Sequence, residues 1–182
     1  MINRIIGVLK LDVNTYEEIE ADESATGQAA IVVSVVAIIG GLIGGGITAA
    51  LGGSFIGSFL STLLNAYVGW VVWAAVTYFV GTQFFGGQAT MGEMLRVLGF
   101  AQAPGILRII PVCGGFIGWI WSIATGFIAV RQGLDVDNTK AIITIVVGWV
   151  AVFIVSLIIG ALLGALGLAG SISMDAIQGL GQ

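Results

Sequence analysis

The sequence predicts an all-α, polytopic integral membrane protein with five transmembrane helices and an amphipathic helix at the N-terminus. The first observation is the stretch from Ser24 to Gly92, which contains no charged residue. A soluble domain needs charge on its surface, whereas a hydrocarbon core about 30 Å thick accepts apolar helices of about 20 residues. The second observation is composition: 58% of the residues are hydrophobic and only 9% are charged, with a mean hydropathy of +1.09.

Composition also excludes several classes of function. The sequence has no histidine, which removes Ser-His-Asp and Cys-His catalysis and the HExxH zinc site. Cys113 is the only cysteine, so neither an internal disulfide nor a CxxC motif is possible. The sequence contains no basic patch, so nucleic acid is not an expected partner. We expect no catalytic residue, no cofactor and no metal site.

Two stretches resemble functional sites only in part. Ser54 follows two glycines, but the nucleophile elbow G-x-S-x-G requires glycine where Ile56 stands, and the sequence offers no histidine base. The acidic residues from Glu17 to Glu23 lack the spacing of a calcium-binding loop. We interpret them as a solvated acidic face.

Three segments make up the predicted chain. Residues 1–25 form a cytoplasmic amphipathic and acidic segment, residues 26–168 a five-span membrane domain, and residues 169–182 a short tail. Apolar residues recur at helical spacing in the first segment: Ile2, Ile5, Ile6, Leu9 and Val13. This spacing predicts a helix over residues 2–13 that either lies on the membrane surface or packs against the spans.

Five apolar segments are long enough to cross the bilayer. They cover residues 27–48, 57–82, 91–110, 114–131 and 139–166. Glycines four residues apart allow two helices to approach closely in lipid. The first span contains such a pair in Gly40 and Gly44, and the fifth contains another in Gly160 and Gly164. We expect these faces to pack against other helices, in the fold or in an oligomer.

The third segment, residues 91–110, differs from the others because it carries charged and polar residues. Thr90 and Glu93 have the spacing of a capping box, which predicts a helix start. Pro104 lacks a backbone donor and should kink the helix. Ionisable residues within a span are candidates for function, so Arg96 and Arg108 either anchor the structure or belong to a permeation or lipid-headgroup site. Arg108 lies near one end of the segment, where its long side chain can extend to the interface.

Arg96 is expected on the tightly packed side of this third helix. Steps of four, three and four residues place Gly92, Arg96, Gly99 and Ala103 on one face. We expect Arg96 to be partly buried at the cytoplasmic edge. Its partner is either Glu93, one turn earlier, or the carbonyls at the end of a neighbouring helix. The expected role of Arg96 is to fix the kinked helix in register.

Basic residues predict the orientation in the membrane. With five spans and the N-terminus inside, five of the six basic residues face the inside and only Arg108 faces the outside. The opposite orientation reverses this ratio. The sequence therefore predicts a cytoplasmic N-terminus and an outside C-terminus.

Five short motifs occur in order along the chain. They are TYEEIE at 15–20, LGFAQAPG at 98–105, GWIW at 118–121, RQGL at 131–134 and KAI at 140–142. This order resembles the prokaryotic branch of the Yip family, the Ypt/Rab-interacting-protein membrane domain. The resemblance covers nearly the whole chain and is most specific over residues 94–142.

The resemblance implies a five-span fold and, for the prokaryotic branch, a location in the plasma membrane. Eukaryotic relatives belong to the early secretory pathway, where they associate with one another and with Rab-type GTPases. Their Asp-Leu-Tyr-Gly-Pro-type motif does not occur in this sequence, and residues 1–25 offer little surface for a GTPase. The resemblance therefore carries the fold and not the trafficking role.

Two functions are compatible with these features. The first is a non-enzymatic scaffold or accessory subunit that associates with itself or with other membrane proteins, as a homo-oligomer or in a larger complex, through Gly-rich helix faces. The second is a small channel or transporter built around the kinked third span. A polar cavity across the bilayer would favour the second, and a dry core would favour the first. The lipid bilayer is a partner in both.

Overall fold

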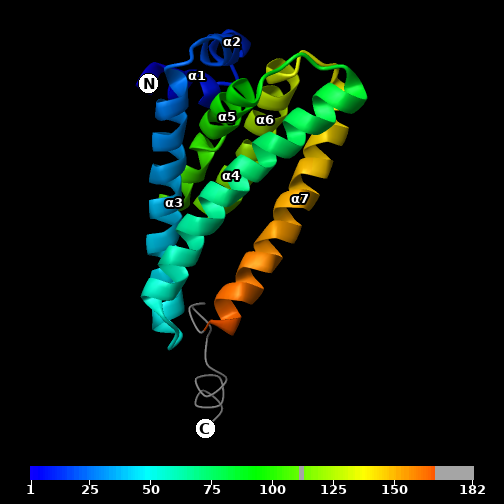
Figure 1. The fold of residues 1–182 in the computed structure, drawn as a ribbon. Coiled ribbons are helices and arrows are strands. Elements are labelled where there is room, and N and C mark those ends of the chain that lie inside the picture. Colours follow the sequence, from blue (N-terminus) through cyan, green and yellow to red (C-terminus); the bar gives the residue numbers. More distant parts are fainter. Residues whose placement is uncertain (111–112, 167–182) are drawn as a thin grey trace.

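The computed structural model describes residues 1–110 and 113–166, and this part of the chain is all-α, as predicted (Figure 1). Its elements are α1 (Ile2–Leu9), α2 (Val13–Ala21), α3 (Ala25–Ala50), α4 (Phe55–Phe85), α5 (Met91–Phe100), the 3-10 helix η1 (Ala103–Ile109), α6 (Gly114–Gly133) and α7 (Asn138–Ala165). The predicted tail, residues 169–182, lies outside the described residues.

Four helices of the described chain are long and apolar enough to cross a membrane: α3, α4, α6 and α7. The expected third span, residues 91–110, is instead divided into α5 and η1. Ten α-helical and seven 3-10 residues rise about 15 Å and about 14 Å, so the divided segment reaches at most the thickness of the hydrocarbon core. The structure therefore supports four full-length spans, and a fifth crossing stays a prediction.

Pro104 explains why the third segment is divided. In a continuous α-helix its ring would collide with the carbonyl of Phe100, and it has no N–H to donate. Accordingly α5 ends at Phe100, and the chain continues as a 3-10 helix from Ala103. At the break, Thr125 Oγ1 of α6 donates a hydrogen bond of 2.8 Å to the carbonyl of Ala101. A neighbouring helix thus supplies a partner for an acceptor of the interrupted one.

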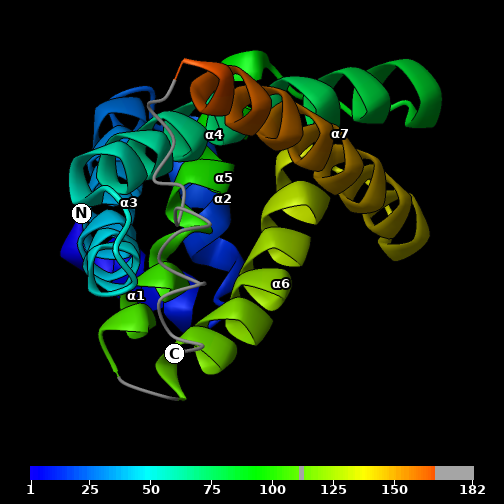
Figure 2. The ribbon, with the colours of Figure 1, turned by 90° about the horizontal axis from the view of Figure 1, so that it is seen from below.

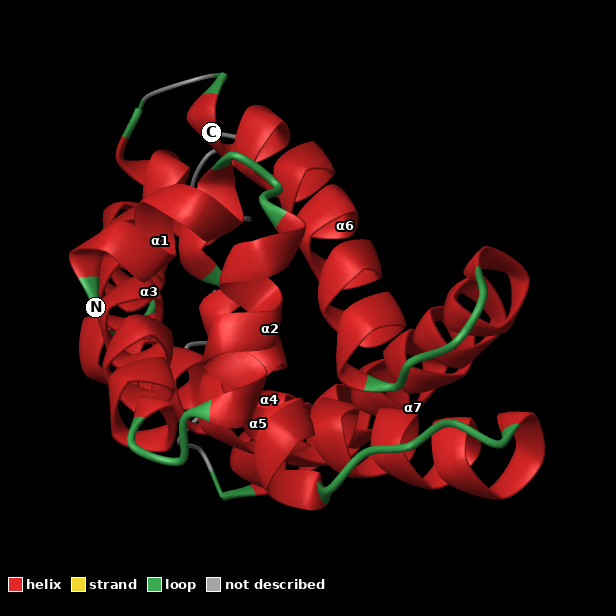
Figure 3. Ribbon diagram, turned by 90° about the horizontal axis from the view of Figure 1, so that it is seen from above, coloured by secondary structure: helices red, strands yellow, loops and turns green. Residues whose placement is uncertain are grey.

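The N-terminal segment forms two helices where the sequence predicted one. The Asp12 side chain accepts from the backbone N–H of Asn14 and caps the start of α2. The fully buried side chains of Tyr16 and Ile19 pack α2 into the core. The Tyr16 hydroxyl donates to the carbonyl of Thr125 on α6 at 3.2 Å. Figure 3 shows α1 and α2 together at the end of the bundle, which we call the N-terminal end.

One side of α1 packs against the bundle. Val8 is fully buried, and Trp121 Nε1 of α6 donates to the carbonyl of Leu9 at 2.8 Å. On the other side, Ile2 is 68% exposed and Ile6 is 45% exposed. Of the two arrangements that the sequence left open, the structure shows packing. Contact of Ile2 and Ile6 with lipid stays a prediction.

The hydrophobic core surrounds α5. Figure 2 shows α5 inside an arc formed by α3, α4, α7 and α6. The buried side chains of α5 contact those of α2 and α6. The largest fully buried side chains of this core are Tyr16, Ile19, Met94, Leu98, Phe100 and Leu134. By contrast, α3, α4 and α7 expose rows of large apolar side chains over most of their length. Such surfaces are typical of helices that face lipid.

Glycine allows α3 and α4 to pack closely as an antiparallel pair. A Cβ atom placed on Gly41 would lie 2.8 Å from the ring of Phe59, and one on Gly45 would lie 2.9 Å from the ring of Phe55. The two rings are stacked along α4, with centroids 6.0 Å apart. The glycines of α3 that pack tightly on α4 are therefore Gly41 and Gly45, each one residue after a member of the predicted pair, Gly40 and Gly44.

Of that predicted pair, Gly44 has looser surroundings, and Gly40 contacts a side chain of η1 and not a helix backbone. A Cβ on Gly44 would lie 4.0 Å from Ser58 Oγ, which is an ordinary contact. A Cβ on Gly40 would face the Arg108 side chain. A packing role for Gly40 and Gly44 stays a prediction.

Gly45→Leu should lower the free energy of unfolding by about 1–3 kcal/mol, because a larger side chain would overpack the α3–α4 contact. Gly46→Leu is the matched control, since no described atom lies within 4 Å of a Cβ at Gly46. Both variants gain the same helix propensity. Thermal unfolding in mild detergent compares them, and equal melting temperatures would contradict the packing described for α3 and α4.

Candidate functional site: a polar cleft beside Arg108

A polar cleft lies between α3, α4 and η1. It has a volume of about 380 Å³ and adjoins a second cavity of about 190 Å³ toward α6 and α7. The two cavities share Val36, Gln102 and Arg108. The polar residues of the larger cavity are Ser61, Thr62, Asn65, Gln102 and Arg108. The break between α5 and η1 places Gln102 at the junction of the two cavities.

The Arg108 guanidinium lies against the surface of α3. Its Nη1 atom is 3.1 Å from the position of a Cβ on Gly40. Gly40 lies ten residues before Ala50, the last residue of α3, which corresponds to about 15 Å along the helix. The surface of α3 at Gly40 has no side chain and leaves room for the guanidinium. The extension of Arg108 to the interface stays a prediction. The Arg108 side chain remains exposed in the cleft.

Arg108 has no acidic partner among the described residues. The acids of the described chain lie in residues 12–23, at Glu93 and at 135–137, all toward the N-terminal end. The ion pairs between described residues join Arg4 to Glu18 and Asp22, and Lys140 to Asp137. A cation at membrane depth costs several kcal/mol unless its charge is compensated. The cleft therefore carries positive charge.

The wall of the cleft on α4 carries hydrogen-bond acceptors. Asn65 Nδ2 donates to the carbonyl of Ser61 at 2.9 Å, while Asn65 Oδ1 is buried without a partner in the described structure. The Ser61 and Thr62 hydroxyls both donate to the carbonyl of Ser58 at 2.9 Å, which leaves their oxygen lone pairs available. The sequence marks Asn65 as a candidate for a buried polar residue within the second span, but sequence reasoning missed Ser61 and Thr62. The signal for the group is the spacing of three polar residues along one turn of an apolar helix.

Arg96 belongs to the opposite, buried half of the molecule. Only 6% of its surface is exposed. Its Nε atom donates to the carbonyl of Glu20, in the last turn of α2, at 3.1 Å, and Nη2 donates to the same oxygen. The Glu93 side chain instead accepts from the backbone N–H of Thr90 and completes the capping box. Of the two predicted partners of Arg96, the structure shows the helix-end carbonyl.

Gly99 lies at a close contact of α5 with α3 and α4. A Cβ on Gly99 would lie 2.7 Å from Cβ of Ala29 and 3.1 Å from the Trp70 ring. The same ring donates through Nε1 to the carbonyl of Leu95 at 3.0 Å. Three helices therefore meet at Gly99, one turn after Arg96.

Acidic residues gather around Glu20 at the N-terminal end. Partial burial raises the pKa of Glu20 to about 7, and the negative charges of Asp135, Glu17 and Glu93 act in the same direction. The positive charge of Arg96 opposes this shift. Within residues 1–110 and 113–166, no group of three or more acidic or cysteine side chains has an arrangement that could hold a metal ion.

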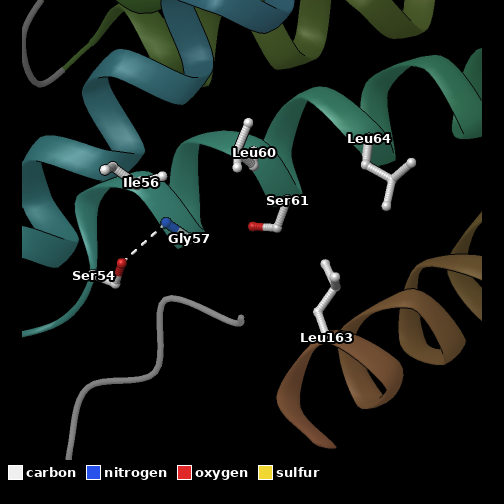
Figure 4. Close-up of a pocket in the computed structure, with 7 residues that line it drawn as sticks. All are labelled: Ser54, Ile56, Gly57, Leu60, Ser61, Leu64 and Leu163. Atoms are coloured by element: carbon white, nitrogen blue, oxygen red, sulfur yellow. Dashed lines mark hydrogen bonds between the residues drawn. The ribbon is translucent and has the colours of Figure 1, made fainter. Parts of the chain in front are cut away.

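Gly160 and Gly164 lie on a part of α7 that has few neighbours within the chain. No described atom is within 4 Å of a Cβ on either residue. Closer to its start, α7 packs tightly on α4, where a Cβ on Gly148 would lie 2.6 Å from the Trp73 ring. Toward its end, Leu163 faces a cavity of about 370 Å³ that separates α7 from the start of α4 (Figure 4). The predicted packing of Gly160 and Gly164 stays a prediction.

These features define the class of the protein: it is a polytopic, all-helical integral membrane protein with a broken helix inside an arc of long apolar ones. The Yip1 domain model matches residues 6–174. The chain therefore belongs to the Yip1 domain family, as its motifs predicted. This is a family of membrane proteins that is not known for enzymatic activity. No curated protein and no solved structure matches the chain.

Arg96→Leu should lower the free energy of unfolding by about 1.5–3 kcal/mol, because it removes a charged donor and leaves the Glu20 carbonyl without that partner. Arg131→Leu is the control, since Arg131 is half-buried and its Nε donates to the adjacent side chain of Gln132. Thermal unfolding in detergent measures both. An equal loss in the two variants would mean that Arg96 does not anchor α5 to α2.

The free energy of unfolding should fall as the pH rises from about 4.5 to about 7, because of Glu20. The folded state holds the Glu20 proton up to about pH 7, whereas an ordinary glutamate loses it near 4.5, so folding binds a proton in this window. The contribution is complete below the lower value and lost above the upper one. Glu20→Gln should flatten this part of the melting-temperature profile.

The exposed Glu23→Gln is the control for Glu20→Gln and should leave the profile unchanged. Asp22 titrates in a different window, since hydrogen bonds from Ser24 and Arg4 lower its pKa from 3.8 to about 2. The stability that Asp22 contributes is lost only as the pH falls from about 3.8 to about 2, which is below the range in which Glu20 titrates. A profile between pH 4.5 and 7 that Glu20→Gln leaves unaltered would contradict the assignment.

Proposed function

We propose that the protein is a non-enzymatic membrane scaffold or accessory subunit that associates with itself or with other membrane proteins through the second half of α7. One observation carries the proposal: Gly160 and Gly164 lie one turn apart with no described atom within 4 Å of either Cβ position. A glycine pair at this spacing allows the backbone of a second helix to approach closely in lipid. The surrounding side chains of Leu157 and Leu162 are exposed and apolar.

A packed core supports the scaffold over a channel or transporter. Between the polar surroundings of Arg96 and the cleft at Gln102, α5 carries Val97, Leu98 and Phe100, all fully buried. These side chains pack against α2 and α6, so the hydrophobic core occupies the region through which a transport path along α5 would run. Membership of the Yip1 domain family also supports association with membrane proteins.

The proposal includes a cytoplasmic N-terminus in a prokaryotic plasma membrane. Figure 1 supports the sidedness by placing α1, α2 and the α6–α7 connection at one end of the bundle. Four basic residues lie in or beside these elements: Arg4, Lys10, Arg131 and Lys140. Basic residues favour the cytoplasmic side.

The double substitution Gly160→Leu and Gly164→Leu should weaken association at least about tenfold, because the added side chains block close backbone approach. The melting temperature of the monomer should remain unchanged, since neither glycine has a neighbour in the described chain. Cross-linking in native membranes, followed by native mass spectrometry of the purified protein, measures both self-association and bound partner proteins.

Gly46→Leu is the matched control for this double variant, because Gly46 is equally open but lies on α3. It should leave association intact. If the double variant retains the same oligomers and the same partner proteins as the wild type, the second half of α7 is not the interface.

A further inference from the structure

We propose that the cleft between α3, α4 and η1 binds the headgroup of an anionic phospholipid. Arg108 would bind the phosphate, and Asn65 would accept a hydrogen bond from a headgroup hydroxyl. This site is formed by α3, α4 and η1, whereas Gly160 and Gly164 lie on α7, so the inference goes beyond the proposed scaffold function and does not depend on it.

Charge is the first argument for an anionic ligand. In a bilayer that α3 spans, a guanidinium about 15 Å from the nearer end of this helix has less access to water than at a free surface. The described acids lie at the N-terminal end and do not compensate it. Arginine binds phosphate oxygens through two parallel N–H donors, which makes a phosphate the most suitable counter-charge.

Asn65 is the second argument, and it is independent of the charge. Its Oδ1 atom is buried in the structure without a hydrogen-bond partner, although a buried polar atom of this kind normally has one. Asn65 lines the cleft, so a small rotation of its amide would let a hydrogen-bond donor of the ligand reach this oxygen. Ser61 and Thr62 line the same cavity, and their hydroxyl oxygens can serve as two further acceptors. A phosphate esterified to an alcohol with free hydroxyls offers both the anion and the donors.

The location of the cleft favours a lipid over a soluble anion. Exposed apolar side chains follow Arg108 along the chain, namely Ile109 and Ile110. In a bilayer, acyl chains can contact these residues while the headgroup fills the cleft. The volume of about 380 Å³ is within the range of about 300–1,000 Å³ typical of small-ligand sites.

The test uses the full chain, purified in a mild neutral detergent and depleted of lipid. Thermal unfolding is followed while phosphatidylglycerol, phosphatidylcholine or inorganic phosphate is added, and native mass spectrometry counts retained lipids. Phosphatidylglycerol should bind at least about tenfold more tightly than phosphatidylcholine and should raise the melting temperature. Inorganic phosphate should have no effect at the same concentration.

Arg108→Gln should weaken phosphatidylglycerol binding at least about tenfold, and Arg108→Lys should retain part of it. Arg131→Gln, at the N-terminal end, is the matched control and should bind like the wild type. Asn65→Leu should reduce the preference for phosphatidylglycerol over phosphatidic acid, which has no headgroup alcohol. This last readout would not change if Asn65 served only to stabilise α4.

Three outcomes would overturn the inference. Wild-type affinity of Arg108→Gln for phosphatidylglycerol would exclude Arg108 from the site. Stabilisation by inorganic phosphate, with no further effect of the lipid, would assign the cleft to a soluble anion. Asp175 lies outside the described residues, and an equal loss of stability in Arg108→Gln and Asp175→Asn without lipid would identify an ion pair within the chain.

Discussion

The fold depends on the break between α5 and η1. A backbone carbonyl in lipid needs a partner within the protein, because no water is present to supply one. Pro104 prevents α5 from continuing, and Thr125 of α6 donates to the carbonyl of Ala101 at the break. This bond requires α6 to lie against the end of α5, and Tyr16 of α2 donates to the carbonyl of the same Thr125. The broken helix therefore fixes the positions of α6 and α2 as well as its own.

The same break gives the two arginines of the third segment different environments. On a straight α-helix, Arg96 and Arg108 would lie about 18 Å apart along one axis, each near an interface. In the structure, Arg96 donates to the Glu20 carbonyl inside the packed half, whereas Arg108 lies on η1 beside the bare surface of α3 at Gly40. The first arginine fastens the N-terminal helices to the bundle. The second leaves a positive charge in an accessible cleft.

Local chemistry made much of the fold predictable, and contacts between distant segments limited the rest. The capping box of Thr90 and Glu93 and the effect of Pro104 depend on neighbours in sequence, so their spacing was informative. The hydrogen bond from Arg96 to Glu20 joins residues 76 positions apart, and the sequence indicated only a class of partner. Likewise, a repeat of four residues identified glycine-rich faces of α3 but not that Gly41 and Gly45 face the phenylalanines of α4. Residues one position apart on a helix point in directions about 100° apart. The neighbouring helix therefore determines which of the two glycine pairs is packed.

The cleft and the unpacked part of α7 arise from the same distribution of packing. The core concentrates around α5 at the N-terminal end, where α2, α5 and α6 meet, and the ends of α3, α4 and α7 extend beyond it. Long helices without a central partner enclose cavities, such as those at Arg108 and at Leu163. In water such an end would collapse or aggregate, but in a bilayer lipids and other helices can fill it at little cost, because their contacts replace equivalent ones with acyl chains. The half of the molecule with the sparser core is therefore the half that is suited to bind components of the membrane.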